Sequence, residues 1–570
     1  MSSDRECTPD SLPAKIHRPM NFRIALLLAF VPSAVLAQNP LAIPPALDLD
    51  TFDLVVDEHV HQFYPGINTN TYGASAEYLG PTLIMHRGDT TNVRVHNELA
   101  QITSMHWHGM HVPGEQDGGP QRIVQPGEMW HARFNVANPA GTYWYHPHPH
   151  ELTAEQANFG IAGFIIVQDE DEAQLALPRT YGVDDFPIVV QDRKFQSNGD
   201  FAFYPFGDSV LVNGTPNAFL ECPAQVVRLR LLNGSNARIY ALGLEDGGSF
   251  QVIAGDGGLL PAPALTDRLW LSNGERAEVL LDLAGMEGDS LLLMSYGSEL
   301  PLTVPGSGNI LWESSSLNGI DFPVLRIRVV APTPDPITSI PTTLIDHVAP
   351  SETESVVTRT KTITGNGMVG MGMFMINGAM FDMDVINDTM QLGTVEVWNI
   401  VNNSNMAHPM HIHGVSFFIL ERNGAPPPLW ERGPKDVVVV DRFEVVKLIM
   451  RFDMPTDGWP FMYHCHNLLH EDNMMMLQYI VEDAGMGSPD NGRTMNTRSY
   501  PVPTRDHLSF EAPFGITGIK VADSSGRVVL QITGSGATVG ELEVGMLPVG
   551  VYTLTLVGSD RTAHLRFVRE

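Results

Sequence analysis

The chain has 570 residues, of which 43% are hydrophobic and 17% are charged, so it is longer than one ordinary domain. Its 52 glycines and 42 prolines favour many short strands joined by turns and argue against long charged helices. The formal net charge of −31 excludes nucleic acid and anionic membranes as preferred partners; it either attracts metal cations or only keeps an exported protein soluble.

The segment before residue 38 has the pattern of a signal peptide. A basic start at residues 20–23 precedes an apolar run at 24–31, and residues 35–37 offer a small-residue cleavage site. We therefore expect residues 1–37 to be an N-terminal extension and signal peptide. The mature protein is expected to be secreted, periplasmic or held at the cell surface.

Strand-like segments follow along the chain, bounded by Gly, Pro, Asn and Asp. They are expected at residues 91–96, 163–167, 188–191, 226–232, 276–283, 395–401 and 443–452. Asn-Gly turns in similar apolar settings, at Asn213-Gly214 and Asn377-Gly378, suggest that one unit is repeated. The pattern predicts an all-β protein built of β-sandwiches.

The end of the chain reads as a separate unit. Residues 484–501 are rich in Gly, Ser, Pro and Asn, which is typical of a linker. Alternating apolar and polar residues at 516–521, 527–532, 540–544 and 551–557 predict a small β-sandwich over residues 502–570.

Histidines spaced two apart are the strongest sign of chemistry. Six His-x-His pairs occur among 21 histidines, where random placement would give roughly one. Because side chains i and i+2 of a strand point to one face, roughly 6 to 7 Å apart, a pair can aim two imidazoles at one metal cluster. Four pairs stand in distinctive settings: His106 and His108, His146 and His148, His411 and His413, and His464 and His466.

Cys465 lies between His464 and His466, so strand alternation directs its thiol to the opposite face, toward a second metal centre. One strand would then connect two metal sites through covalent bonds. The ligands of the second centre can come from nearby positions, namely His408, Cys465, His470 and Met475. Two imidazoles, one thiolate and a weak axial thioether are the ligand set of a blue-copper electron-transfer site.

These motifs, in this order, resemble the multicopper oxidase family over about residues 45–483. The most specific part is residues 464–475, His-Cys-His-Asn-Leu-Leu-His-Glu-Asp-Asn-Met-Met. Bacterial copper-efflux oxidases and related laccases look most similar, through residues 112–121 and 376–382. The resemblance implies three cupredoxin-like Greek-key β-sandwich domains at residues 38–172, 173–335 and 336–483.

The same resemblance implies a cofactor of four copper ions, with a three-copper cluster between the first and third domains. The type 1 copper would be held by His408, Cys465, His470 and Met475. The type 2 copper would be held by His106 and His411. The binuclear type 3 pair would be held by His108, His146, His148, His413, His464 and His466.

The activity implied is that of a laccase-like oxidase, which takes single electrons at the type 1 copper, passes them through Cys465 and reduces O2 to water. Asp117 and Glu471 match acidic positions that the family uses for proton delivery. The alternative for each is a carboxylate that only orients a ligand imidazole. Because the ligand positions are already filled, we expect no metal ligation by four nearby histidines, His59, His61, His111 and His150.

The electron donor stays open between phenols or aromatic amines and low-valent Cu(I), Fe(II) or Mn(II). A methionine axial ligand favours easily oxidised donors, such as Cu(I), Fe(II), substituted phenols and aromatic amines. The Met-rich segment 368–383 could bind Cu(I) through soft thioethers, but we favour packing, because Met fills irregular cores. Met406 agrees with the copper-efflux pattern. Ser404, however, stands where that pattern has an acidic residue, and a long Met/His-rich insert is missing.

The C-terminal unit resembles the sorting domain of type IX secretion, through residues 500–504, 519–526, 547–552 and 565–570. This implies the secretion machinery as a partner, and the alternative is an ordinary appended β-domain.

The alternative to an enzyme is a non-catalytic copper-binding or scaffold protein of the same fold. We expect a monomer.

Overall fold

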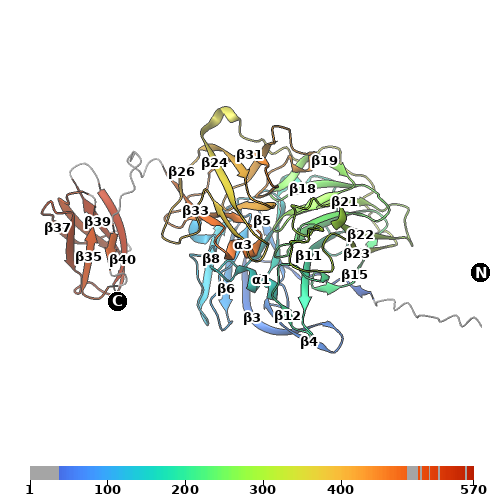
Figure 1. Ribbon diagram of the computed structural model, residues 1–570, viewed down its shortest axis with the longest axis horizontal. Helices are drawn as coiled ribbons and strands as arrows, with labels where there is room; N and C mark the ends of the chain where they lie inside the picture. The colour runs from blue at the N-terminus through green and yellow to red at the C-terminus, as the bar shows by residue number, and fades with distance from the viewer. Residues whose placement is uncertain are drawn as a thin grey trace, which may run out of the picture. The chain divides into compact units, whose positions relative to one another are not determined.

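The computed structural model describes residues 38–483, 498–500, 504–512, 514–523, 527–558 and 562–569. The predicted signal peptide at 1–37 lies outside these ranges, as does most of the predicted linker at 484–501. The chain forms two compact units, one ending at Glu482 and one beginning at Asp483 (Figure 1). Strands make up most of the regular structure of the described residues, so the predicted all-β class is confirmed.

Two sheets enclose the first core. One consists, in spatial order, of β4 (Ile67–Ala74), β3 (Thr51–Tyr64), β6 (Thr90–Asn97) and β8 (Met129–Asn135). The other consists of β2 (Ala46–Asp48), β5 (Thr82–His86), β10 (Gly163–Gln168), β9 (Gly141–His146) and β7 (His106–His108). Side chains of β8 alternate between buried and exposed along its whole length, because one face of its sheet meets the core and the other meets solvent.

The second core lies between two larger sheets. One consists of β14 (Thr215–Pro216), β13 (Ser209–Val212), β11 (Asp185–Phe195), β16 (Val226–Asn233), β21 (Arg276–Asp282), β18 (Phe250–Gly255) and β19 (Gly258–Thr266), with β12 (Phe201–Ala202) beside β11. The other consists of β1 (Asn39–Pro40), β15 (Ala218–Pro223), β23 (Asp321–Val330), β22 (Ser290–Tyr296), β17 (Tyr240–Leu244) and β20 (Leu269–Leu271).

The third core has the same two-sheet arrangement. One sheet consists of β25 (Met373–Ile376), β24 (Ser355–Asn366), β27 (Val395–Asn402), β31 (Val445–Arg451) and β29 (Phe417–Arg422). The other consists of β26 (Asp388–Gln391), β33 (Met476–Glu482), β32 (Phe461–Cys465), β28 (His408–Ile412) and β30 (Val437–Val440). The two strands that carry the late histidine motifs, β28 and β32, are therefore neighbours.

The three domains repeat one strand pattern. In each, a long strand pairs parallel with a second strand, which pairs antiparallel with a third: β3, β6 and β8; β11, β16 and β21; β24, β27 and β31. Asn213-Gly214 and Asn377-Gly378 form equivalent turns beside β11 and β24, and all four residues have positive φ, between 48° and 74°. The predicted repeat is confirmed.

Short helices connect the strands, and contact between two of them, α1 and α3, joins the first and third domains. They are α1 (Thr153–Phe159), α2 (Glu170–Ala173) and α3 (Leu468–Asp472), with 3-10 turns at η1 (Gly114–Gln116), η2 (Gly297–Glu299), η3 (Glu352–Glu354) and η4 (Leu429–Glu431). The N-terminus of α1 is capped by Asp472 of α3, whose carboxylate accepts the N–H groups of Thr153 and Ala154 at 3.0 and 2.9 Å. Figure 1 shows α1 and α3 side by side.

Buried charges tie the first domain to the second. Glu278 accepts hydrogen bonds from Arg228 at 2.9 Å, from Arg230 at 2.8 Å and from the Thr142 hydroxyl of the first domain at 2.7 Å. Although burial would raise it, the two guanidinium groups lower the pKa of Glu278 to about 2. Because a buried charge is tolerated only when paired and hydrogen-bonded, these contacts fix how the two sheets meet.

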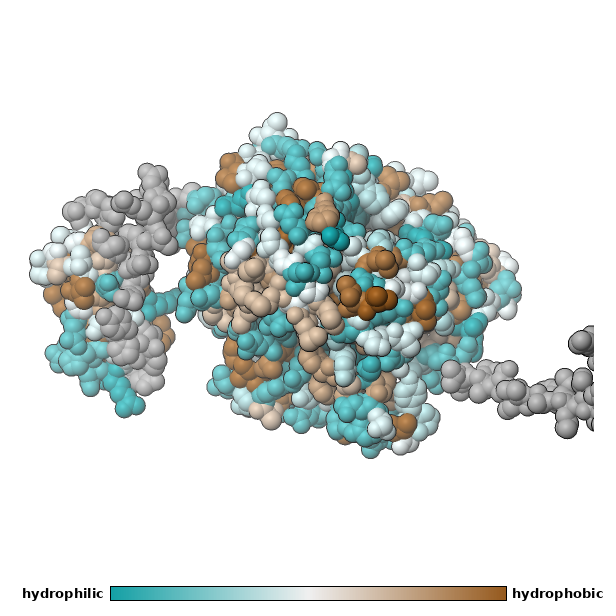
Figure 2. All heavy atoms as spheres, in the orientation of Figure 1, coloured by the Kyte–Doolittle hydropathy of each residue, from teal (hydrophilic) through white to brown (hydrophobic). Residues whose placement is uncertain are grey.

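The visible face of the large unit carries hydrophilic and hydrophobic residues interspersed with one another (Figure 2). None of the helices in the described part of the chain has the length and apolar composition that crossing a bilayer requires.

The C-terminal unit has its own core, which includes Leu508, Val521 and Leu554. One sheet consists of β34 (Arg498–Tyr500), β35 (His507–Glu511) and β38 (Val539–Glu543). The other consists of β37 (Val528–Thr533), β36 (Gly518–Asp523), β39 (Gly550–Val557) and β40 (Thr562–Arg569). The predicted small β-sandwich is therefore confirmed, but β34 shows that residues 498–500 of the predicted linker pair with its first sheet.

Candidate metal centre

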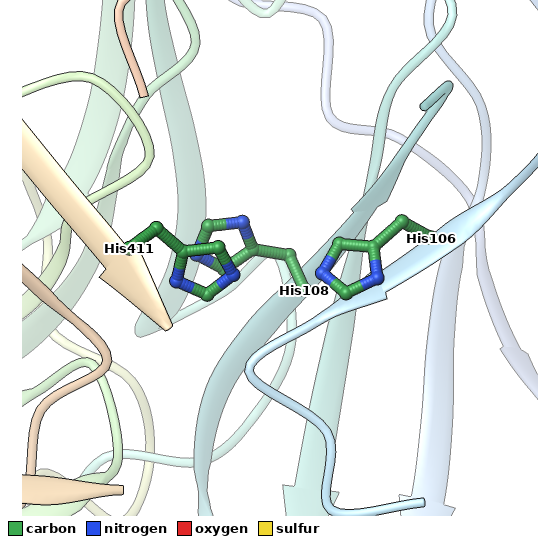
Figure 3. A group of neighbouring side chains, drawn as sticks. All are labelled: His106, His108 and His411. Carbon is green, nitrogen blue, oxygen red and sulfur yellow. The ribbon is translucent and has the colours of Figure 1, made fainter. Parts of the chain in front are cut away.

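Eight histidines converge where the first domain meets the third, and we call them the eight-histidine cluster. They are His106, His108, His146, His148, His411, His413, His464 and His466, each at most 1% exposed. Strand pairing brings them together: His106 lies opposite His146 in β7 and β9, and His411 lies opposite His464 in β28 and β32. Figure 3 shows the rings of His106 and His108 facing His411 across this junction.

Two groups of three imidazole nitrogens stand out within the cluster. In one, His108 Nδ1 lies 3.3 Å from His146 Nε2 and 3.2 Å from His466 Nε2. In the other group, His464 Nε2 lies 3.4 Å from His148 Nε2 and 3.1 Å from His413 Nε2.

In the pairs His146/His148 and His464/His466, the two histidines belong to different groups of three. Only the first pair lies wholly within a strand; His413 and His466 directly follow the last residue of theirs, and His148 lies two residues beyond the end of β9. These two pairs therefore divide between ligand groups, whereas His106 and His108 come together beside His411 in a further group. The pairs still supply one cluster, as the spacing predicts.

His106 and His411 have buried Nε2 atoms without a hydrogen-bond partner within the described residues. Their Nδ1 atoms lie 3.0 and 2.8 Å from the backbone oxygens of Asp117 and Asp436. An Nδ1–H that donates to these oxygens leaves the lone pair on Nε2. A buried acceptor without a partner is unfavourable, and a metal ion bound by nitrogen would satisfy it.

A second constellation lies in the core of the third domain, and we call it the cysteine site: His408, Cys465, His470 and Met475. The Cys465 sulfur lies 3.5 Å from His408 Nδ1 and 3.5 Å from His470 Nδ1. Met475 is fully buried, and its backbone pairs with His470 at 2.9 Å and with Cys465 at 3.1 Å, which returns the chain to the site.

Burial favours the neutral form of several of these imidazoles. It lowers the pKa of His148 to about 4 and the pKa values of His466 and His470 to about 3. Neutral imidazole is the form that donates a lone pair to a metal ion. Burial also raises the pKa of the Cys465 thiol, so that a bound metal must displace its proton.

Two predicted acidic residues border the eight-histidine cluster. The Asp117 carboxylate accepts from His413 Nδ1 at 2.8 Å and lies 3.5 Å from His106 Nδ1. The Glu471 oxygens lie 3.3 and 3.1 Å from Nδ1 of His148 and His464. Each carboxylate thus bridges one ligand from the first domain and one from the third.

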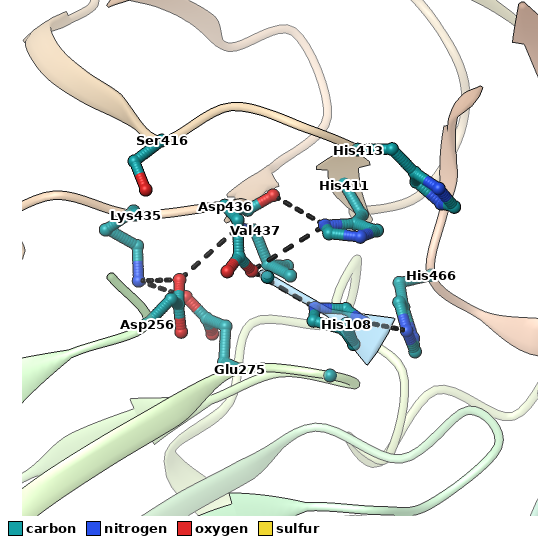
Figure 4. A network of polar contacts seen from close by, with 12 residues as sticks. His108, Asp256, Glu275, His411, His413, Ser416, Lys435, Asp436, Val437 and His466 are labelled. Atoms are coloured by element: carbon teal, nitrogen blue, oxygen red, sulfur yellow. Dashed lines mark hydrogen bonds and ion pairs between the residues drawn. The ribbon is translucent and has the colours of Figure 1, made fainter. Parts of the chain in front are cut away.

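A further carboxylate, Asp436, is absent from the sequence-based prediction. It lies beside His108, His411 and Lys435, near the Lys435 partners Asp256 and Glu275 (Figure 4). Its carboxylate also accepts from the buried Arg276 of the second domain. The feature of the sequence that could have revealed Asp436 is the charged pair Lys435-Asp436, directly before the apolar run at residues 437–440. Charged residues at the start of a buried strand are rarely left unpaired.

The other histidines near the motifs have separate surroundings. The His111 ring lies 3.0 Å from the Ser416 hydroxyl, and burial lowers the pKa of His111 to about 4. His61 pairs with Glu77 at 3.0 Å, and the His150 ring packs at 5.2 Å against Phe381.

The predicted packing role of the Met-rich segment is wrong for its tip. Met371 is 74% exposed and Met373 is 62% exposed, because the hairpin of β24 and β25 turns its tip to solvent. The buried apolar side chains of this segment are Val369, Phe374, Ile376 and Phe381. The Phe374 ring lies 4.6 Å from the rings of both His408 and His470.

Two family models match parts of the chain. Both are described as multicopper oxidase, and they match residues 56–172 and 350–485. These ranges contain all of the predicted metal ligands.

The chain is also similar to whole proteins. It is 33% identical to the multicopper oxidase mco of Staphylococcus epidermidis, over 75% of this chain and 88% of the relative. It is 34% identical to the cell division protein FtsP of Escherichia coli, over 80% and 96%. A solved structure of the laccase-like multi-copper oxidase CueO from Ochrobactrum sp. matches with a TM-score of 0.70 and 34% identity, over 78% of this chain and 100% of that one.

Proposed function

Because this chain belongs to the multicopper oxidase family, we propose that electrons enter at the cysteine site and reach O2 at the eight-histidine cluster. The protein is an oxidoreductase that uses copper. It couples one-electron oxidation of a small donor to four-electron reduction of O2 to water. The observation that carries the proposal is that Cys465 joins the two sites through its own backbone.

The proposed ligand sets follow the geometric groups. Type 1 copper is assigned to His408, Cys465, His470 and Met475. Type 2 copper is assigned to His106 and His411, whose unpaired buried Nε2 atoms support the assignment. The type 3 ions are assigned to His108, His146 and His466 and to His148, His413 and His464. This donor set, nitrogen at one centre and nitrogen with sulfur at the other, fits copper.

When bound, copper supplies the one-electron redox chemistry and the site of O2 reduction. The residues of this chain hold those ions, exclude water and shorten the path between them. Cys465 is adjacent to His464 and His466 in the chain, and its carbonyl oxygen accepts from His464 Nδ1 at 3.2 Å. Complete burial of these side chains supports reduction without loss of partly reduced oxygen to solvent.

Oxygen uptake by the copper-loaded mature protein tests this function. We expect four copper ions per chain, blue absorbance and O2 consumption with a substituted phenol. The Cys465→Ser variant removes the thiolate with little change in volume, so it should lose the blue colour and donor-driven O2 uptake while the eight-histidine cluster still loads. A colourless wild-type protein, or a blue one that consumes no O2, would contradict the proposal.

A non-catalytic scaffold is the second candidate, because one relative is named as a cell division protein. A scaffold has no need of a buried thiol held 3.5 Å from two imidazoles, or of eight converging histidines. The oxygen-uptake experiment separates the two functions.

We propose Asp117 and Glu471 as the groups that pass protons to reduced oxygen. Both are buried at the cluster, and each contacts two ligand imidazoles, which supports delivery of protons from its carboxylate. The alternative is that they only orient those rings.

The Asp117→Asn variant separates these roles. An amide oxygen can still accept from His413 Nδ1, but the side chain can no longer take up and release a proton. We expect full copper loading and unchanged blue absorbance, with O2 reduction slowed about 100-fold. Unchanged turnover across pH would remove Asp117 from proton delivery, and incomplete copper loading would assign it to ligand orientation. Glu471→Gln is the matched second variant.

For the donor, we propose small phenols and aromatic amines that approach over the hairpin tip beside the cysteine site. Phe374 links this tip to the rings of His408 and His470. The exposed thioethers of Met371 and Met373 are the feature that favours Cu(I) as an alternative donor.

Steady-state rates with a phenol, Cu(I), Fe(II) and Mn(II) decide between these donors. We expect the double variant Met371→Leu, Met373→Leu to keep the phenol rate, because leucine preserves the apolar surface. If the wild type oxidises Cu(I) much faster than phenol and the double variant loses that rate alone, the protein is a metal oxidase.

We propose export through a signal peptide at residues 1–37 and sorting by the domain at 502–570. Support comes from the basic, apolar and small-residue pattern of the first segment and from the separate core of the second. Apart from β1, the ranges 38–172, 173–335 and 336–483 each contain one pair of sheets, which supports these domain boundaries.

Mass spectrometry of the protein recovered from its native cells tests export. We expect a mature N-terminus near Gln38 and enzyme outside the cytoplasm, because an exported chain loses its signal peptide. Deletion of residues 484–570 should leave the copper enzyme folded but retain it in the periplasm. Normal surface delivery of the truncated chain would show that the domain has another role.

A further inference from the structure

Arg276 is the first residue of β21 in the second domain, which supplies none of the proposed copper ligands, yet it reaches Asp436 at the border of the eight-histidine cluster. Figure 4 shows Asp436 there, beside His108 and His411. The Arg276 side chain is fully buried. All five of its N–H donors are used: two bind the Asp436 carboxylate at 2.7 and 2.5 Å, and three bind the backbone oxygens of Thr142, Gly274 and Asp256 at 3.1, 2.9 and 2.8 Å. One guanidinium therefore contacts all three domains.

Asp436 connects this guanidinium to two proposed copper ligands. Its carboxylate lies 3.1 Å from His108 Nε2, and its backbone oxygen accepts from His411 Nδ1 at 2.8 Å. His108 thus presents Nδ1 to the cluster, whereas His411 presents Nε2. Because the partner of one ring nitrogen decides which nitrogen keeps its lone pair, Asp436 sets opposite tautomers in the two rings.

Gly274 connects the same guanidinium to a third ligand. Its φ is +79°, and an added Cβ would lie 2.8 to 2.9 Å from three ring atoms of His466. The backbone at Gly274 therefore forms the surface on which the His466 ring rests. Its carbonyl oxygen is held by Arg276 at 2.9 Å.

The local charges also favour this arrangement. Arg276 and Lys435 face three buried carboxylates, those of Asp256, Glu275 and Asp436, all within 3.7 Å of one of the two cations. The two cations fix these groups in place. Three carboxylates against two cations leave one negative charge in excess, and Asp436, which lies beside the cluster, favours bound cations there.

We propose that Arg276 is a positioning residue for the eight-histidine cluster. Acting through Asp436 it sets the tautomers of two imidazoles, and acting through Gly274 it supports the ring of a third. The second domain would then control the copper affinity of a site to which it gives no ligand. This inference rests on the proposed ligand assignment.

The Arg276→Lys variant tests it, because lysine keeps the charge but loses the planar fork. The matched control is Arg230→Lys, which is also buried in the second domain and also removes a bidentate pair, with Asp185 at 2.7 and 2.7 Å, and a contact with Thr142. Arg230 touches none of the proposed ligands.

The readouts are copper per chain, the electron paramagnetic resonance signal of type 2 copper and the near-ultraviolet absorbance of the type 3 pair. The blue band of the cysteine site serves as an internal standard. We expect Arg276→Lys to keep the blue band while copper affinity at the cluster falls about 10- to 100-fold, and Arg230→Lys to keep both. Wild-type loading and spectra in Arg276→Lys, or an equal loss in Arg230→Lys, would overturn the inference.

A second variant covers the case in which Arg276→Lys does not fold. Gly274→Ala should perturb the type 3 absorbance through His466 and leave the blue band unchanged, whereas a wild-type spectrum would overturn the proposed support of that ring. Failure of the wild-type protein to bind four coppers would instead contradict the proposed function itself, so the two failures are distinguishable.

Discussion

The structure depends on one constraint: a buried imidazole that gives one nitrogen to a fixed partner keeps its other nitrogen free for a metal ion. His106, His411 and His413 meet it through Nδ1 contacts with Asp117 and Asp436. Without such partners a ring could rotate or change tautomer, and its lone pair would no longer face the cluster. Neutral rings are also required, and burial lowers the pKa of rings such as those of His148, His466 and His470 by penalising the protonated form.

That constraint explains why the three repeated domains have different roles. The first and third each place two His-x-His pairs at their junction, on β7, β9, β28 and β32. The second repeats their strand pattern without such pairs and instead contributes buried charges, Arg276 to the cluster border and Glu278 to the first domain. The same β-sandwich architecture thus supplies histidines to the cluster in two domains, and in the other supplies buried charges that hold the domains together.

The sequence predicts residues that stand in short local motifs. It misses residues whose role depends on a partner far away in the chain. The twelve proposed ligand positions stand in short local motifs, and the Asn-Gly turns at Asn213 and Asn377 follow from turn chemistry; such local patterns are readable in a sequence. Asp436 and Arg276 are 160 residues apart, so nothing in either segment reveals their pairing. The Met371 side chain was misjudged for a similar reason, since composition does not show which side of a hairpin faces solvent.

Placing the cluster at a domain junction links metal binding to domain docking. Four of its histidines belong to the first domain and four to the third, and Asp117 and Glu471 each bridge one of each. An ion that binds only the docked arrangement stabilises it by mass action, whereas undocking separates the two halves of each proposed type 2 and type 3 ligand set. The cap that Asp472 gives to α1 and the guanidinium of Arg276 act on the same junction before any metal arrives, and they lower the cost of assembling it.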